Sequence, residues 1–200
     1  MSLRNPLGDL PVTDPQAMRA LAHPVRLAVL SHLQRYGPAT ATQLAPHVGA
    51  SPSVTSWHLR HLATFGLVLD ADPSEVPGDR RQRWWKAAAR GFRVEVGEGD
   101  EAEAASRVLG SELFATGRRQ VDAWLADTEP GLESSWRRVA GVSNTSVKLT
   151  PDELKRLEDA IDELLGPYVM RPEAGSPPDA RRVRVLRYFL PEAAAPEADR

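Results

Sequence analysis

The spacing of apolar residues predicts four short helices in the first third of the chain. The first begins at the capping Thr13-Asp14-Pro15 and runs to about Ala22. The second covers residues 24–36 and stops at a Gly-Pro pair. The third begins at a capping Thr40 and runs to about His47, and the fourth begins at a Ser-Pro pair in the stretch 51–64. The four predicted helices thus follow one another closely, with only a few residues between them.

The junction between the third and fourth helices is predicted to be a sharp turn. Gly49 stands there, and such a turn often needs a left-handed backbone that glycine adopts without cost. Residues 67–69 are then predicted as a strand, residues 70–79 as a Pro-, Gly- and Asp-rich loop, and residues 80–86 ("RRQRWWK") as the returning strand. A helix-turn-helix followed directly by two strands and a basic loop predicts a wing. The paired tryptophans Trp84 and Trp85 are expected to pack rather than to stack on a ligand.

The fourth helix has an unusual outer face. If Thr55, Leu59 and Leu62 form its inner side, the side chains that point outward are those of Ser53, Trp57, Arg60 and His61. No Asp or Glu occurs between residues 51 and 64, whereas an ordinary solvated face normally includes acids. Ser, Arg and His donate hydrogen bonds to phosphates and base edges, so this face is typical of a helix that enters the major groove of DNA.

Charge supports the same interpretation. The chain of 200 residues has a net charge of -2, but residues 1–93 carry +5 and residues 94–200 carry -7. A basic first half indicates contact with a polyanion.

Several stretches together resemble ArsR-type bacterial transcription regulators. They are "LAHPVRLAVL", "ATQLAPHVGASPSVTSWHLRHL", "GLV" and the basic strand "RRQRWWK", and they cover roughly residues 13–90. The resemblance implies a winged helix-turn-helix, a homodimer, and sequence-specific binding of double-stranded DNA, with repression as the usual outcome. On this basis the residues expected to contact DNA are Thr40, Gln43, Ser51, Ser53, Val54, Ser56, Trp57, Arg60, His61, Arg80, Arg81 and Arg83.

The second half is predicted to hold the subunits together. Residues 101–127 form a longer helix with a narrow apolar stripe whose middle is small, which suits close packing against a partner helix. The residues predicted to form the dimer contact are Ala105, Leu109, Leu113, Val121 and Trp124. A strand–helix–strand appendage is predicted over residues 146–190, with a capping box at Thr150 that starts its helix.

The expected fold class is therefore mainly α within an α+β architecture. Residues 13–93 form the winged helix-turn-helix domain, residues 94–190 the dimerisation and effector region, and residues 1–12 and 191–200 are disordered ends.

Several classes of site are not expected. The chain has no cysteine, and its five histidines all lie at or before His61, so the metal sites of ArsR-type relatives do not carry over. His58 and His61 have a spacing that could hold a metal, but no third ligand is evident. No nucleophile elbow, dinucleotide fingerprint or phosphate loop occurs, so neither an enzyme nor a cofactor is expected. No membrane contact is expected, and the location expected from the N-terminal sequence is the cytoplasm.

Two alternatives to a simple repressor remain open. One is a sensor in which the second half of the chain binds an apolar small-molecule effector between the long helix and the strand–helix–strand appendage. The other is a winged helix that has lost DNA binding and contacts a protein instead.

Overall fold

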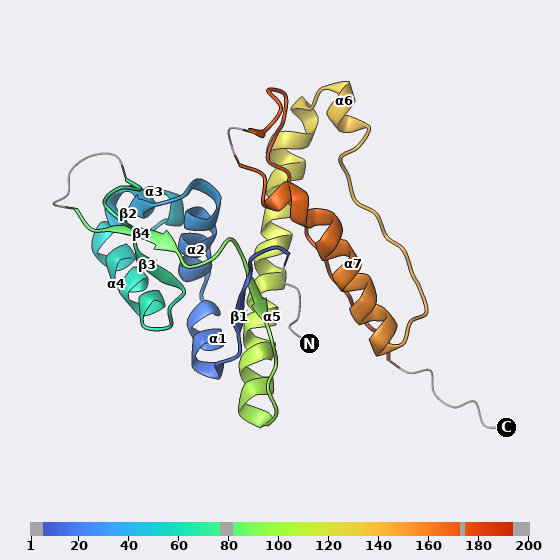
Figure 1. Ribbon diagram of the computed structural model, residues 1–200, viewed down its shortest axis with the longest axis horizontal. Helices are drawn as coiled ribbons and strands as arrows, with labels where there is room; N and C mark the ends of the chain where they lie inside the picture. The colour runs from blue at the N-terminus through green and yellow to red at the C-terminus, as the bar shows by residue number, and fades with distance from the viewer. Residues whose placement is uncertain (1–5, 77–81, 173–174, 194–200) are drawn as a thin grey trace. The chain divides into compact units, whose positions relative to one another are not determined.

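The computed structural model describes residues 6–76, 82–172 and 175–193. Its contacts divide the chain into two units, residues 1–170 and residues 171–200. Unit 1 holds all the helices and strands that the described residues form (Figure 1). The fold class is α+β, as predicted. None of the described helices has the length and apolar character needed to cross a membrane.

The four predicted helices are confirmed. They are α1 (Pro15–Leu21), α2 (Pro24–Tyr36), α3 (Ala41–Val48) and α4 (Pro52–Ala63). Each begins at a side chain that accepts a hydrogen bond from the first turn: Asp14, His23, Thr40 and Ser51. These caps satisfy backbone donors that a helix start would otherwise leave without a partner.

A three-stranded antiparallel sheet closes the helix-turn-helix. Its order is β2 (Ala39–Thr40), β4 (Trp84–Ala87) and β3 (Val68–Asp70), with Val68 opposite Ala87. The two-residue β2 was not predicted. The returning strand starts later than predicted, so Arg83 precedes it. Arg80 and Arg81 lie outside the described residues.

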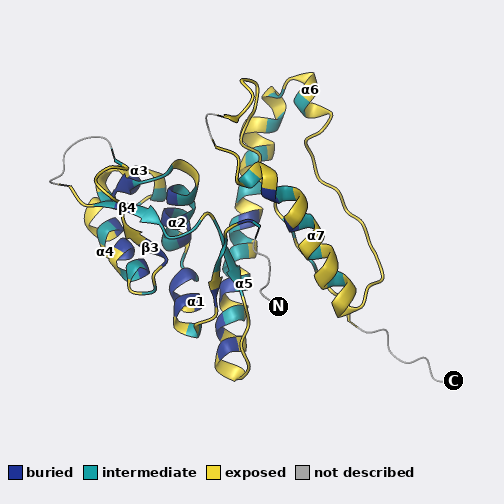
Figure 2. Cartoon of the chain, in the orientation of Figure 1, coloured by how far each residue is buried: buried dark blue, intermediate teal, exposed yellow. Residues whose placement is uncertain are grey.

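The core joins these helices to the sheet (Figure 2). Met18 and Leu21 of α1, Leu44 of α3 and Leu59 of α4 are fully buried. Trp85 of β4 is almost fully buried among them, which confirms packing as its role.

The prediction that residues 1–12 are disordered is wrong for the part that the structure describes. β1 (Leu10–Val12) pairs in parallel with β5 (Phe92–Val94), and both Leu7 and Val12 are buried. Three residues with a proline give almost no strand pattern, so pairing with a distant segment decides their structure.

The long helix α5 (Asp100–Ala123) is confirmed, but its apolar stripe does not lie where we predicted. α5 packs along α1, and Ala105 and Leu109 are completely buried in the core of their own chain. Their assignment to a dimer contact is therefore wrong. Helix α1 thus covers the narrow stripe for which the sequence predicts a second subunit. Leu113 is partly buried against the same core.

Beyond α5 the chain forms a π-helical turn (Trp124–Thr128), a 3-10 turn (Glu129–Gly131) and the short α6 (Ser134–Arg137). Helix α7 (Pro151–Val169) then begins with the predicted capping box between Thr150 and Glu153.

The strands predicted on either side of α7 are wrong. Residues 146–150 and 182–190 have no strand structure, although both stretches are described in full. Their β-branched residues indicate strands only when a neighbouring edge is available, because β-propensity measures packing more than backbone preference.

Candidate nucleic-acid interface

The turn between α3 and α4 has the geometry that its sequence requires. Gly49 adopts a left-handed conformation with φ 65° and ψ 34°, and Ala50 N–H bonds to the carbonyl of Ala45. The Ser51 hydroxyl then accepts the Val54 N–H at 3.3 Å and starts α4. This turn fixes the direction in which α4 leaves α3.

The inner face of α4 is as predicted. Thr55, Leu59 and Leu62 are fully buried. The Thr55 hydroxyl donates to the Ser51 carbonyl at 2.9 Å, so a polar side chain enters the core with a hydrogen-bond partner.

The outer face of α4 is accessible. Ser53, Val54, Trp57 and Arg60 are exposed, while Ser56 and His61 are half-buried (Figure 2). An Arg60 N–H donates to the Ser56 hydroxyl at 3.0 Å, one turn apart. The guanidinium group has five N–H donors, so most of them remain for another acceptor.

The prediction that Thr40 contacts DNA is wrong. Thr40 is only 3% exposed, and its hydroxyl accepts the Gln43 N–H at 3.2 Å. The Gln43 side-chain oxygen in turn accepts the Thr40 N–H at 2.9 Å. Both side chains therefore form the capping box of α3. Gln43 is exposed, and the capping box does not use its amide donors.

An aromatic column runs along α4 beside its outer face. The rings of Trp57 and His61 are stacked, with centroids 5.5 Å apart and planes within 6° of parallel. His61 also contacts the edge of Phe65 at 5.4 Å, and Trp57 contacts His58 at 4.9 Å. Phe65 was not among the predicted site residues, although residues 57, 61 and 65 lie four apart and so share one side of the helix. His58 was considered only as a metal ligand.

A group of basic side chains lies behind this column. His58 is buried, and its ring lies 4.8 Å from that of His23 at the start of α2. Burial lowers the pKa of His58, and His23, Arg26 and His61 add to this effect. Burial likewise lowers the pKa of His23, which Arg26 lowers further and Glu112 raises. His58 Nδ1 and Arg26 Nε are buried without a hydrogen-bond partner.

In the described part of the wing, Arg83 and Lys86 are paired with acids. Arg83 forms two hydrogen bonds with Asp70, at 2.6 and 3.0 Å, and lies 4.0 Å over the Trp85 ring. This bonding lowers the pKa of the Asp70 carboxyl. Lys86 pairs with Glu75 at 2.8 Å. Arg83 is thus engaged with Asp70 and would have to be shared or released to reach a phosphate.

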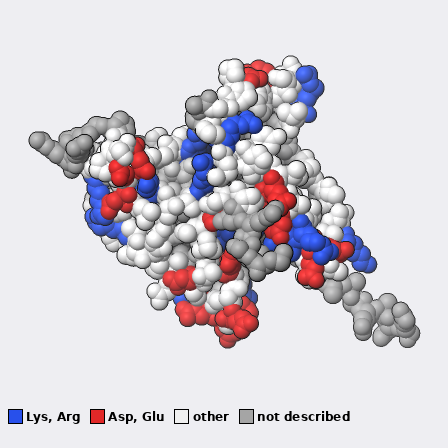
Figure 3. Space-filling model, in the orientation of Figure 1, with Lys and Arg blue, Asp and Glu red and all other residues white. Residues whose placement is uncertain are grey.

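Charge is unevenly spread over the unit. Figure 3 shows acidic side chains gathered where α5 begins, and Asp100, Glu101 and Glu103 form the first turn of that helix. Phosphate would be repelled there, whereas α4 has no acid between residues 51 and 64.

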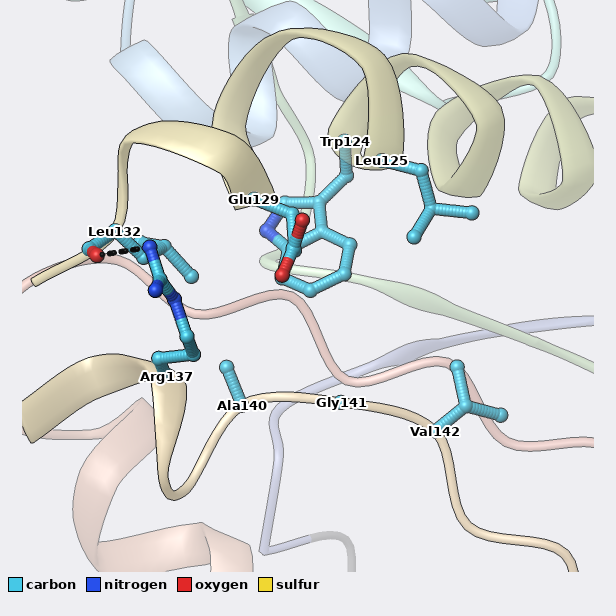
Figure 4. A pocket seen from close by; sticks show the side chains of 8 residues that line it. All are labelled: Trp124, Leu125, Glu129, Leu132, Arg137, Ala140, Gly141 and Val142. Atoms are coloured by element: carbon cyan, nitrogen blue, oxygen red, sulfur yellow. Dashed lines mark hydrogen bonds between the residues drawn. The ribbon is translucent and has the colours of Figure 1, made fainter. Parts of the chain in front are cut away.

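A small cavity lies at the end of α5. It has a volume of about 200 Å³, and its apolar walls include Trp124, Leu125, Leu132 and Val142 (Figure 4). Arg137 at its rim donates to the Leu132 carbonyl at 3.0 Å. The effector site was expected between the long helix and the appendage, but α7 contributes no residue to this cavity. Within the described residues, no three His, Asp or Glu side chains could hold a metal ion together.

Part of the chain is similar to a known protein family. Residues 21–69 match a family described as a helix-turn-helix domain, which extends from the end of α1 into β3. This match supports a DNA-binding regulator, since such domains are regulatory rather than catalytic. No curated protein sequence matches the chain significantly.

Proposed function

We propose that the protein is a sequence-specific transcription regulator of the ArsR type, which binds double-stranded DNA through α4. The observation that carries this proposal is the outer face of α4. It is free of acids, it presents exposed Ser53, Trp57 and Arg60 side chains, and it belongs to the segment that matches a helix-turn-helix domain.

In this proposal the residues of α4 and the wing have separate tasks. Arg60 and Ser53 meet base edges in the major groove, and Arg60 can place two parallel donors on guanine. Ser51 and Ser56 donate to phosphates near the start and side of α4. Arg80, Arg81 and Arg83 on the wing contact the flanking backbone, once Arg83 leaves Asp70.

The regulator acts as a homodimer in this proposal, because one α4 reads too few bases to find a site in a genome. The contact surface differs from the one that the sequence predicts. Phe114 of α5, Leu125 of the π-helical turn that follows it, and Leu157 and Leu164 of α7 are exposed apolar side chains outside the DNA-binding domain. They are the apolar surface that a second subunit would cover. Two copies of α4 then lie about one DNA turn, roughly 34–36 Å, apart. Repression follows if the bound dimer blocks a promoter.

A second candidate function adds an effector to the same DNA-binding protein. The cavity beside Trp124 has mostly apolar walls, with Glu129 and Arg137 among its lining residues. A π-helical turn, a feature that is frequent at functional sites, lines one side of it. A small apolar molecule bound there would act on the end of α5.

Selection from randomised duplex DNA tests the proposed function. The intact protein should enrich a two-fold symmetric sequence, and a gel shift should confirm that it binds this duplex more tightly than random DNA. Enrichment of no sequence would contradict the proposal and would favour a winged helix that binds protein. Repeating the gel shift with DNA from upstream of its own gene tests self-regulation.

A further inference from the structure

Trp57 has an unusual position for a large apolar side chain. Between residues 13 and 76, the exposed large hydrophobic residues are Tyr36, Val54, Trp57 and Leu69. Two of these four lie on the outer face of α4, three residues apart, which makes them neighbours on the helix surface. Val54 is 46% exposed and Trp57 is 54% exposed. Together they form a short apolar strip beside Ser53 and Arg60.

The indole of Trp57 is held in place from behind. His61 stacks on it in parallel at 5.5 Å, and the buried His58 meets it edge-on at 4.9 Å. His61 is in turn supported by Phe65. A side chain that is already fixed loses little rotamer freedom when it binds, so this arrangement favours contact with a ligand over free movement in water.

We propose that Trp57, together with Val54, recognises the C5-methyl group of thymine, and that His61 is the positioning residue for the indole. This inference rests on the proposed function, in which α4 enters the major groove. All four bases present hydrogen-bonding atoms in that groove, but only thymine also presents a methyl group there. The outer face of α4 is thereby divided: Ser53 and Arg60 read polar edges, and the apolar strip reads thymine.

The surroundings of the strip favour DNA over a protein partner. A stable protein–protein contact covers about 800 Å² on each side, far more than two neighbouring side chains offer. No acid lies between residues 51 and 64, and Arg60 borders the strip. These features suit a narrow apolar contact next to phosphates.

The test uses the duplex that wild-type protein selects from random DNA. Each thymine is replaced in turn by deoxyuridine, which removes the methyl group and leaves the hydrogen-bonding edge unchanged. Wild-type protein should bind about fourfold more weakly when a contacted thymine in one half-site is replaced, which corresponds to about 0.8 kcal/mol for one buried methyl group. Trp57→Ala should bind the thymine duplex more weakly and should distinguish it less from the deoxyuridine duplex than wild type does, because only Val54 remains of the strip.

Two further variants give the control and test the role of His61. Tyr36→Ala removes another exposed aromatic ring, which lies on α2 against His32, and it should leave the discrimination intact. His61→Ala should reduce the discrimination, whereas His61→Phe can still stack and should retain it. A merely structural role of His61 would instead weaken binding of both duplexes equally.

Three results would overturn the proposal. The first is wild-type protein that binds its selected duplex but ignores every thymine-to-deoxyuridine change. The second is a selected sequence without thymine in the half-sites. The third is a Trp57→Ala variant whose DNA affinities all equal those of wild type, which would assign the strip to a protein partner. Wild-type protein that selects no sequence would contradict the proposed function itself.

Discussion

Arg93 of β5 donates a hydrogen bond to Asp162 of α7, and the two side chains differ greatly in exposure. The Asp162 side chain is 3% exposed and that of Arg93 is 36% exposed. Arg90 adds a hydrogen bond to the Val169 carbonyl at 3.0 Å, and Gly166 packs against Pro6 so closely that an added Cβ would lie 3.3 Å from it. Helix α7 is thus attached to the parallel strand pair β1–β5 by polar contacts and a glycine.

This asymmetry predicts unequal losses of stability. Arg93→Ala removes the cation that pairs with the buried Asp162 carboxylate. This change should lower the free energy of unfolding by about 3–5 kcal/mol. Asp162→Asn leaves a half-exposed cation that water can solvate, so its loss should be smaller. Urea denaturation measures both. Lys155→Ala, which breaks an exposed pair with Asp159, is the control and should cost less than about 1 kcal/mol. Equal losses for Arg93→Ala and Lys155→Ala would contradict the account.

Four partly or fully buried histidines predict that acid destabilises the fold. Burial is the first cause of the lowered pKa values of His23, His32, His58 and His61. The unfolded chain therefore binds more protons, and the free energy of unfolding should fall as the pH drops below 6.5, until the folded-state pKa values are reached. The lowered carboxyl pKa values of Asp70 and Glu75 act at lower pH.

Urea midpoints measured between pH 8 and pH 5.5 test this dependence. The groups that face His58 are His23 and Arg26 at the start of α2 and Trp57 and His61 on α4, while Glu112 of α5 acts on His23. His58→Leu should flatten the pH dependence. A midpoint that stays constant over this range in wild type would show that these histidines do not destabilise the fold in acid.

Two glycine substitutions should act in opposite directions. A Cβ at Gly49 would meet no atom within 4 Å, so Gly49→Ala is penalised only by its left-handed backbone, by about 1–2 kcal/mol. Gly110 lies inside α5 with equally open space, and Gly110→Ala should stabilise the protein by about 0.5–1 kcal/mol. Thermal unfolding distinguishes the two. A stabilised Gly49→Ala variant would show that the turn does not need the left-handed conformation.

Substitutions at an exposed and at a buried residue of α5 distinguish an effect on dimer formation from an effect on folding. Phe114 is exposed, so Phe114→Asp should disrupt the proposed dimer without unfolding the subunit. Leu109 is fully buried, and Leu109→Ala should cost about 2–5 kcal/mol of stability. Light scattering and circular dichroism measure mass and folding in parallel. A folded Phe114→Asp dimer would place the contact elsewhere.

The sequence was most informative where local chemistry decides the structure. The caps and stop signals of α2 and α4 predicted both ends of these helices to within a residue. The capping box predicted the start of α7, and Gly49 predicted the turn before α4. The spacing Thr40-Ala-Thr-Gln43 also carries a capping box, which the interpretation as DNA contacts overlooked.

Contacts between segments that are distant in the sequence could not be predicted from local chemistry. The three-residue strands at Leu10 and Phe92 exist because they pair with each other, and residues 182–190 lack strand structure despite a suitable composition. The stripe at Ala105 and Leu109 is the same whether α1 or a second subunit covers it.

The central claim, that α4 reads DNA sequence, is tested most directly by one ratio. This ratio is the affinity of a protein for the selected duplex divided by its affinity for random DNA. It is measured for Arg60→Ala and for wild type at the same salt concentration. The account predicts a loss of about 1–3 kcal/mol on the selected duplex and little on random DNA, so the ratio falls. Arg156→Ala, an exposed arginine on α7, is the matched control and should leave the ratio unchanged. A ratio for Arg60→Ala equal to that of wild type would contradict the claim that α4 lies in the major groove.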